Sequence, residues 1–297
     1  MTLEFTTLDD AADPTFNQLL SINDSGTIAG YFGSGAPGHP NKGYTLSSPF
    51  GQGDYTNENF PTSAQTQVTG INNEGTTVGF WVDGQGDNFG FVDEHGGTFT
   101  TAIDPAAASG AAGGPITEQF LGVNNKDQVA GFYTDANGNS HGFVYNIDTN
   151  SFVKVHVPGA TSVTATDIND QGDISGFFQK GGATEGFLEV SGHVYTLSGP
   201  AGATDVQALG LNNKDQVVGS YVGADGNTHG FLYSNTTNHY TTINDPNAAG
   251  STVVNGINNK GDMVGFYTDA AGNTDGMAVG TTGHSHGVEH GMGHLFG

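Results

Sequence analysis

Carboxylate and amide side chains recur in short loops of this chain, and their oxygen atoms could bind a hard cation. The loop that begins at Asp135 has an acceptor at every second position, and a later loop places Asp225 two residues before Asn227. Oxygen ligands of this kind suit Ca²⁺. The same residue types are also typical of hairpin turns, so a turn without metal is the alternative. The candidate calcium ligands are Asp135, Asn137, Asn139, Asp225 and Asn227.

Histidines are concentrated at the C-terminal end of the sequence. Imidazoles beside Glu289 and Met292 could bind Cu²⁺, Ni²⁺ or Zn²⁺. A terminus without regular structure is the competing interpretation. We therefore set residues 283–297 apart as a His/Gly-rich tail, with four candidate metal ligands: His284, His286, His290 and His294.

Three further residues are candidates for ligand binding. Trp81 is the only tryptophan and could stack on a sugar, although packing in a core is the alternative. Asp167 stands where most repeats carry glycine, and we expect Glu118 at the mouth of a central channel. Such carboxylates would serve a hydrolase or a lyase. The spacing reveals no catalytic triad, carboxylate pair or metal-ligand triad, so no catalytic residue is assigned.

A turn built on asparagine recurs along the chain. Its first Asn stands at positions 23, 72, 124, 169, 212 and 258, with gaps of 49, 52, 45, 43 and 46 residues. A period in this range indicates that one supersecondary unit is repeated in space.

One repeat can be divided into four short strands. In the unit from residue 208 to 243, apolar and β-branched stretches alternate with turns rich in Gly, Asn and Asp. Four strands at a spacing of about ten residues predict an antiparallel meander. The first two strands are apolar on both faces, which is typical of the blades of a β-propeller. A solenoid is the competing architecture.

The two ends of the chain indicate how the ring closes. The last unit lacks a fourth strand, whereas residues 4–9 resemble the fourth strands at 99–104 and 240–245. We therefore expect an all-β, six-bladed propeller of four-stranded antiparallel blades over residues 1–282, with the N-terminal strand closing the last blade. Its upper face would carry the Asp/Gly/Asn loops, and its lower face the Asn turns.

Composition restricts the partners. The chain has 30 acidic residues against 6 basic ones, all lysine, and a net charge of −24. This charge repels nucleic acid and anionic membranes and favours cations. Cysteine is absent from the sequence, and no stretch is long and apolar enough to span a membrane.

Three stretches carry a family resemblance: residues 131–143, residues 223–233 and Val-Pro-Gly-Ala-Thr at 157–161. They resemble the bacterial extracellular repeats called the HAF family, which have an Ile-Asn turn and a His-Gly-Phe strand. The resemblance implies a repeat scaffold and export from a bacterium, and it implies no activity. We expect His141 and His229 of this motif to bond backbone carbonyls. Other units replace the histidine by Lys42, Phe89, Glu185 and Asp275.

These observations together predict a secreted, non-enzymatic, monomeric binding protein. Its ligand would be a glycan, a cation or a partner protein. One alternative is a hydrolase or lyase with its site at the upper mouth of the channel. Another is transition-metal binding by the tail.

Overall fold

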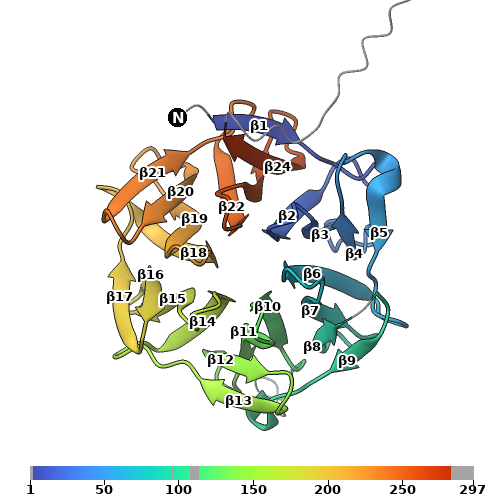
Figure 1. Cartoon of the computed structure of the whole chain (residues 1–297), viewed down its shortest axis with the longest axis horizontal. Helices are drawn as coiled ribbons and strands as arrows, with labels where there is room; N and C mark the ends of the chain where they lie inside the picture. The colour runs from blue at the N-terminus through green and yellow to red at the C-terminus, as the bar shows by residue number, and fades with distance from the viewer. Residues whose placement is uncertain (1–2, 95, 108–113, 282–297) are drawn as a thin grey trace, which may run out of the picture.

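A computed structural model describes residues 3–94, 96–107 and 114–281, and these residues form an all-β ring. Four-stranded antiparallel meanders surround a central axis, with the first strand of each meander innermost (Figure 1). In this described part, two short 3₁₀ turns are the only helical elements: η1 (Gln52–Asp54) and η2 (Pro105–Ala107). Neither is long and apolar enough to cross a membrane.

Four of the sheets contain four strands each. The first sheet has β2 (Asn17–Ile22), β3 (Ile28–Phe32), β4 (Lys42–Leu46) and β5 (Tyr55–Asn57), and the second has β6 (Gln65–Ile71), β7 (Thr77–Val82), β8 (Asn88–Asp93) and β9 (Phe99–Thr101). The third has β10 (Glu118–Val123), β11 (Gln128–Thr134), β12 (Ser140–Asn146) and β13 (Ser151–Lys154). The fourth has β14 (Ser162–Ile168), β15 (Ile174–Lys180), β16 (Ala183–Val190) and β17 (His193–Leu197).

The remaining strands form one eight-stranded sheet made of two meanders. These are β18 (Thr204–Leu211), β19 (Gln216–Val222), β20 (Thr228–Ser234) and β21 (His239–Ile243), followed by β22 (Ser251–Ile257), β23 (Met263–Thr268), β24 (Thr274–Thr281) and β1 (Leu3–Thr7). A single parallel bridge, between Thr228 and Ser251, joins the two meanders.

The ring is closed by the N-terminal strand, as the sequence predicts. β1 pairs antiparallel with β24, with Phe5 opposite Val279 and Thr7 opposite Met277. Figure 1 shows β1 on the outer edge of this sheet, beside β24. Pairing removes the exposed edge that β24 would otherwise offer to another chain.

Each inner strand ends at an Asn turn because an Asn side chain can replace a backbone acceptor. In the third sheet, Asn124 Oδ1 accepts the N–H of Lys126 at 2.9 Å and that of Gln128 at 3.0 Å. The residue between them, Asp127, has a φ of 55°. Four of the equivalent turns place glycine at this left-handed position, where glycine has no steric penalty.

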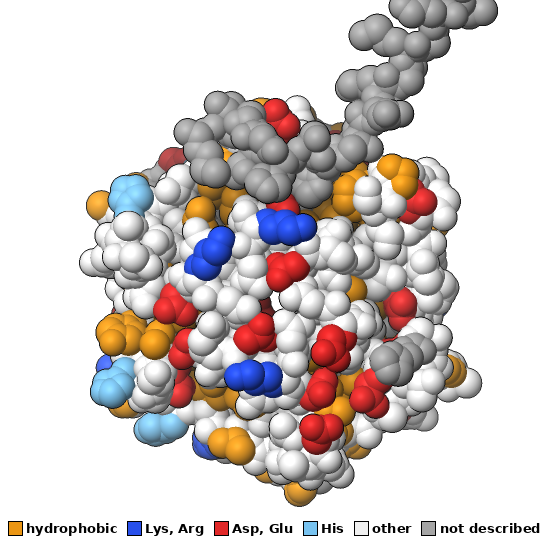
Figure 2. All heavy atoms as spheres, viewed as in Figure 1, with side chains coloured by type: hydrophobic (Ala, Val, Ile, Leu, Met, Phe, Trp, Pro, Cys, Tyr) orange, Lys and Arg blue, Asp and Glu red, His pale blue; other side chains and the backbone are white. Residues whose placement is uncertain are grey.

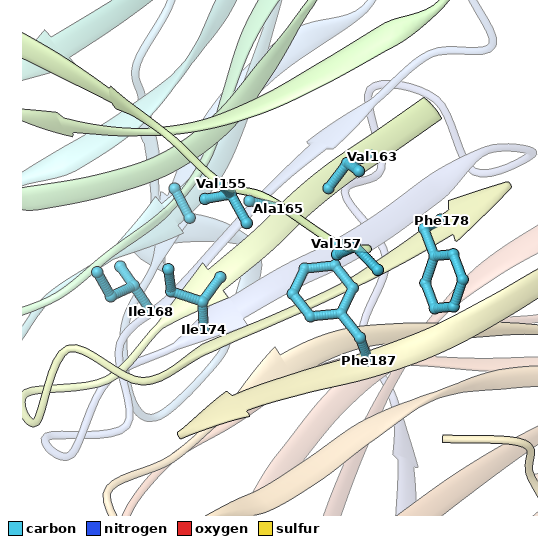
Figure 3. Packing of buried hydrophobic residues seen from close by; sticks show 9 residues of the cluster. Val155, Val157, Val163, Ala165, Ile168, Ile174, Phe178 and Phe187 are labelled. Atoms are coloured by element: carbon cyan, nitrogen blue, oxygen red, sulfur yellow. The ribbon is translucent and has the colours of Figure 1, made fainter. Parts of the chain in front are cut away.

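The core lies between neighbouring sheets. Glycines on the third strands allow this close packing: a Cβ atom on Gly43 of β4 would approach Val68 Cγ2 of the next sheet to 2.7 Å. Between the third and fourth sheets, Val155 and Val157 of the connecting segment lie with Ile174, Phe178 and Phe187 of the fourth sheet (Figure 3). Both faces of an inner sheet are therefore covered, as in a propeller.

Candidate functional site between neighbouring sheets

The lower end of the central channel is surrounded by a circle of hydrogen bonds between asparagines. The Nδ2 of the first Asn in each turn donates to the backbone carbonyl of the equivalent Asn in the next unit, at 2.9–3.4 Å, and the circle runs through Asn23, Asn72, Asn124, Asn169, Asn212, Asn258 and back to Asn23. Each of these side chains is at most 6% exposed. The recurring Asn residues thus join the units to one another as well as forming their turns.

A second circle lies beside the first, and it contains two acids. In each unit, the residue after the first Asn donates its backbone N–H to the side-chain Oδ1 of the equivalent residue in the next unit. The members of this circle are Asp24, Asn73, Asn125, Asp170, Asn213 and Asn259. Burial alone would raise the pKa of Asp24 and of Asp170. Hydrogen bonds from the flanking asparagines outweigh burial and lower both pKa values. Figure 2 shows charged side chains of both signs around the central hollow.

Asp167 lines the channel just above these circles. Its Oδ2 accepts the N–H of Leu211 on the next inner strand at 2.8 Å, and its Oδ1 accepts the N–H of Ile168 at 2.9 Å. Burial nevertheless raises the pKa of Asp167 to about 7. Gly122, at the equivalent place in the third sheet, leaves the room that Asp167 occupies.

The cavity at this end of the channel is small. It has a volume of about 60 Å³ and is lined by the Asn turns, Ser21 and Asp167. A cavity of this size holds a few water molecules. Asp167, a predicted ligand-binding residue, therefore lies at the channel. The cavity beside it has room for water or an ion and is too small for a sugar ring.

Glu118 belongs to a repeated connection between sheets. It is 0% exposed, and its Oε2 accepts the N–H of Asp104, which follows the outer strand of the preceding sheet, at 2.7 Å. Equivalent hydrogen bonds occur in three other units. There the side-chain oxygens of Asn17, Thr66 and Thr252 accept the backbone N–H groups of Asp10, Phe60 and Asp245, respectively. Burial raises the pKa of Glu118 to about 7. Glu118 is not among the described residues that line the channel cavity.

The predicted calcium ligands lie in hairpin turns that use their oxygen atoms. Asp135 Oδ1 accepts the N–H groups of Asn137 at 2.8 Å and Asn139 at 3.0 Å, and its Oδ2 lies 2.9 Å from His141 Nε2. The bond with His141 is the main cause that lowers the pKa of Asp135.

The second loop is built in a similar way. Asp225 accepts the N–H of Asn227 at 3.1 Å and contacts His229 Nε2 at 3.1 Å, and its pKa is lowered to about 2, chiefly by His229. Both histidines therefore bond carboxylates of their own hairpins, whereas we expected backbone carbonyls. No group of three or more His, Asp or Glu residues suited to a metal occurs in the described part of the chain, and the calcium site stays a prediction.

An aromatic residue occupies the same place on the second strand of every unit. These residues are Phe32, Trp81, Tyr133, Phe178, Tyr221 and Tyr267. Directly opposite each, on the third strand, stands the variable position of the repeat: Lys42, Phe89, His141, Glu185, His229 and Asp275, in the same order. We call each such pair, with the nearby residue of the fourth strand, a socket. Each unit thus presents an aromatic side chain next to a side chain whose type varies from unit to unit.

Trp81 shows how a socket can be filled. Its ring stacks on Phe60 at 4.5 Å, and its Nε1 donates to Thr101 Oγ1 of the fourth strand at 3.2 Å. Hydroxyl groups make the same link in two other sockets, between Tyr221 and Thr242 and between Tyr267 and Thr7, each at 2.9 Å. The ring of Trp81 is half-buried in these contacts.

In the third sheet the socket opens into a groove. Lys154 stands where four of the other five fourth strands carry threonine. The groove has a volume of about 500 Å³. Tyr133, Phe143 and Phe152 line one side. The incoming connection, Asp104 to Ala106, lines the other. This combination of aromatic rings with a few polar groups is typical of small-ligand sites.

The sites predicted from the sequence are spread over the molecule. Trp81, Glu118 and Asp167 belong to three different sheets. Tyr133, Phe152 and Lys154 are not among the predicted site residues, although the aromatic position opposite the variable residue was a usable signal. His284, His286, His290 and His294 lie outside the described residues.

Solved structures resemble this chain in fold. A TolB-like protein of Agrobacterium tumefaciens has a TM-score of 0.63 at 12% identity, over 95% of this chain and 99% of that one. AofleA of Arthrobotrys oligospora has a TM-score of 0.59 at 12% identity, over 95% and 88%. A mutant of the Aleuria aurantia lectin, in complex with Fucα1-6GlcNAc, has a TM-score of 0.52 at 13% identity, over 90% and 95%.

These similarities show that the chain has a propeller-type fold. No protein-family model matches the sequence, and no curated protein matches it either. The HAF-type resemblance therefore stays a prediction.

Proposed function

We propose that the chain is a secreted, non-enzymatic, six-bladed propeller that binds neutral glycans in grooves between its blades. The count of six follows if the eight-stranded sheet is divided at the bridge between Thr228 and Ser251. Export is taken from the HAF-type resemblance. The lectin in complex with a fucosylated disaccharide supports a glycan as ligand for a ring of this type.

The observation that carries the proposal is the open socket of the third sheet. The rings of Tyr133 and Phe152 line the groove, and Tyr133 also stacks on His141. Asn150, Lys154 and Asp104 offer hydrogen-bonding groups around the same groove. A sugar presents both an apolar face and hydroxyl groups, so it matches this lining. The volume of about 500 Å³ also lies within the usual range for small-ligand sites.

The test is a glycan array followed by calorimetric titration of the glycans that bind. Tyr133→Ala should weaken binding at least tenfold, because it removes the ring that forms the groove wall. Tyr195→Ala is the matched control, since Tyr195 is a 50% exposed tyrosine of β17 and does not line this groove. Binding that survives Tyr133→Ala, or an array with no bound glycan, would remove the proposal.

The other functions stay predictions. Within the described residues we find no observation that favours a hydrolase or a lyase over a binding protein. The transition-metal proposal concerns residues 283–297, and removal of those residues should abolish Cu²⁺ or Ni²⁺ binding while leaving the melting temperature unchanged.

A further inference from the structure

A second groove lies between the third and fourth sheets. It has a volume of about 620 Å³, compared with about 500 Å³ for the groove beside Tyr133. One side is formed by β13 and the segment from Val155 to Pro158, and the other by β15, β16 and β17. In each groove, the second-strand aromatic residue of a sheet lies opposite the segment that enters that sheet. These residues are Phe178 in the present groove and Tyr133 in the groove of the third sheet.

The floor of this groove is aliphatic. Val144 and Val153 of the third sheet and Val194 of the fourth contribute its accessible apolar surface. Beneath them lie the core side chains of Val155, Val157 and Ile174, which are at most 6% exposed. Figure 3 shows Val155, Val157, Ile174 and Phe178 gathered in this region. Val153 is 66% exposed and is one of three exposed large apolar side chains among the described residues. An aliphatic floor suits a hydrocarbon chain better than it suits a sugar.

The upper end of the groove is basic. Lys154 ends β13, Lys180 ends β15, and His156 lies in the connection between the sheets. The Lys180 side chain extends over the Pro158–Gly159 turn, where its Nζ would lie 3.5 Å from a Cβ atom on Gly159. Among the described residues, neither lysine forms an ion pair within 4.0 Å, although the chain has 30 acidic residues.

The lower end has the opposite character. Glu189, near the end of β16, lies there with Gly192 and His193 of the following turn. Burial, and then the nearby Asp173, raise the pKa of Glu189. The charge therefore changes along the groove, from two unpaired lysines at the top to a carboxyl group at the bottom. An anion would be placed at the upper end only.

We propose that this groove binds a free amphipathic carboxylate, with its carboxylate between Lys154 and Lys180 and its hydrocarbon chain along the valine floor. The net charge of −24 repels anionic bilayers, whereas the local positive charge of Lys154 and Lys180 favours a single carboxylate inside the groove. This inference concerns another ligand class, but the two grooves share Lys154. Lys180→Met, at a residue that lines only the present groove, therefore tests the inference separately from the glycan site.

Calorimetric titration with decanoate below its micelle concentration tests the charged end. The double variant Lys154→Met/Lys180→Met should weaken decanoate binding at least tenfold. The control Lys214→Met/Lys260→Met removes the same charge from Asn turns on the lower face and should change binding less than twofold. Equal losses in the two variants, or no decanoate binding by the wild type, would overturn the proposal.

Chain length tests the apolar floor. Each buried methylene is worth about 0.8 kcal/mol, or roughly a fourfold change in Kd. Octanoate should therefore bind at least fourfold more weakly than decanoate, and decyl glucoside, which has no charge, should be insensitive to Lys180→Met. Tyr133→Ala should leave decanoate binding unchanged. A loss with that variant, or equal affinity for octanoate and decanoate, would contradict the assignment of the groove.

Discussion

Carboxyl groups in this ring differ in pKa according to the hydrogen bonds that they accept. Asp135 and Asp225 accept bonds from their own turns and from a histidine, and their pKa values are lowered. Glu118 and Asp167 lie where burial is the larger effect, and their pKa values rise to about 7. Neither has a cationic partner among the groups that shift its pKa, so each costs stability when it ionises.

The pKa of Glu118 leads to a prediction about pH. Its pKa of about 7 in the folded state exceeds the ordinary value of 4.5 for a glutamate, so the folded state binds more protons between these values. Stability contributed by the neutral carboxyl group is present below pH 4.5 and is lost as the pH rises through 7. Glu118→Gln should therefore raise the free energy of unfolding by about 1–3 kcal/mol at pH 8 and leave it unchanged at pH 4.

Urea denaturation of both proteins at the two pH values would check this expectation. Glu74→Gln, at an exposed position, is the control and should have no effect at either pH. A gain of equal size at pH 4 and pH 8 would show that the charge of Glu118 is not the cause.

Among the strands and turns, the Asn turn is the part of the fold that the sequence predicts best. Its period shows that one meander is repeated, and the match between residues 4–9 and other fourth strands identifies the closing strand. The hydrogen-bonded circles could not be predicted, because each bond joins residues 43 to 52 positions apart or, at closure, 235 apart. A local pattern of residues carries no information about such distant partners.

The Asn circle should make a large contribution to stability. Asn124→Ala removes three bonds within the turn and the bond to the carbonyl of Asn169, all at a buried position. We expect a loss of about 2–4 kcal/mol in the free energy of unfolding. Asn137→Ala, in an exposed upper loop, should cost less than about 0.5 kcal/mol. Chemical denaturation measures both values, and similar costs would argue against the circle as a stabilising element.

The two grooves illustrate what sequence analysis could not find. Lys154 and Lys180 belong to different repeats, and only the packing of one sheet on the next brings them to one groove. The overall charge favoured cations as partners, whereas this groove has a local excess of positive charge. Trp81 attracted attention as the only tryptophan, yet its ring packs on Phe60, and the equivalent Tyr133 lines an open groove.

At the scale of the whole molecule, stability should depend on the closure made by β1. Deleting residues 1–7 would expose the edge of β24 and remove the packing of Leu3 and Phe5 on the neighbouring core. We expect the melting temperature to fall by roughly 5–10 °C and the protein to form dimers or larger species through the free edge.

Calorimetry and light scattering would measure the two effects of this deletion. Glu4→Ala alters an exposed side chain of the same strand and should leave both unchanged. A shortened chain that stays monomeric with an unaltered melting temperature would mean that β1 is dispensable.

The pairing of β1 with β24 also has a consequence for biosynthesis. Residues 3–7 leave the ribosome long before residues 277–281 exist, so they have no partner while the intervening sheets form. Every other fourth strand pairs with a strand made just before it. Nascent chains halted before β24 should therefore hold a nearly complete ring with a protease-sensitive leading segment, and release of the finished polypeptide should be the event that protects it.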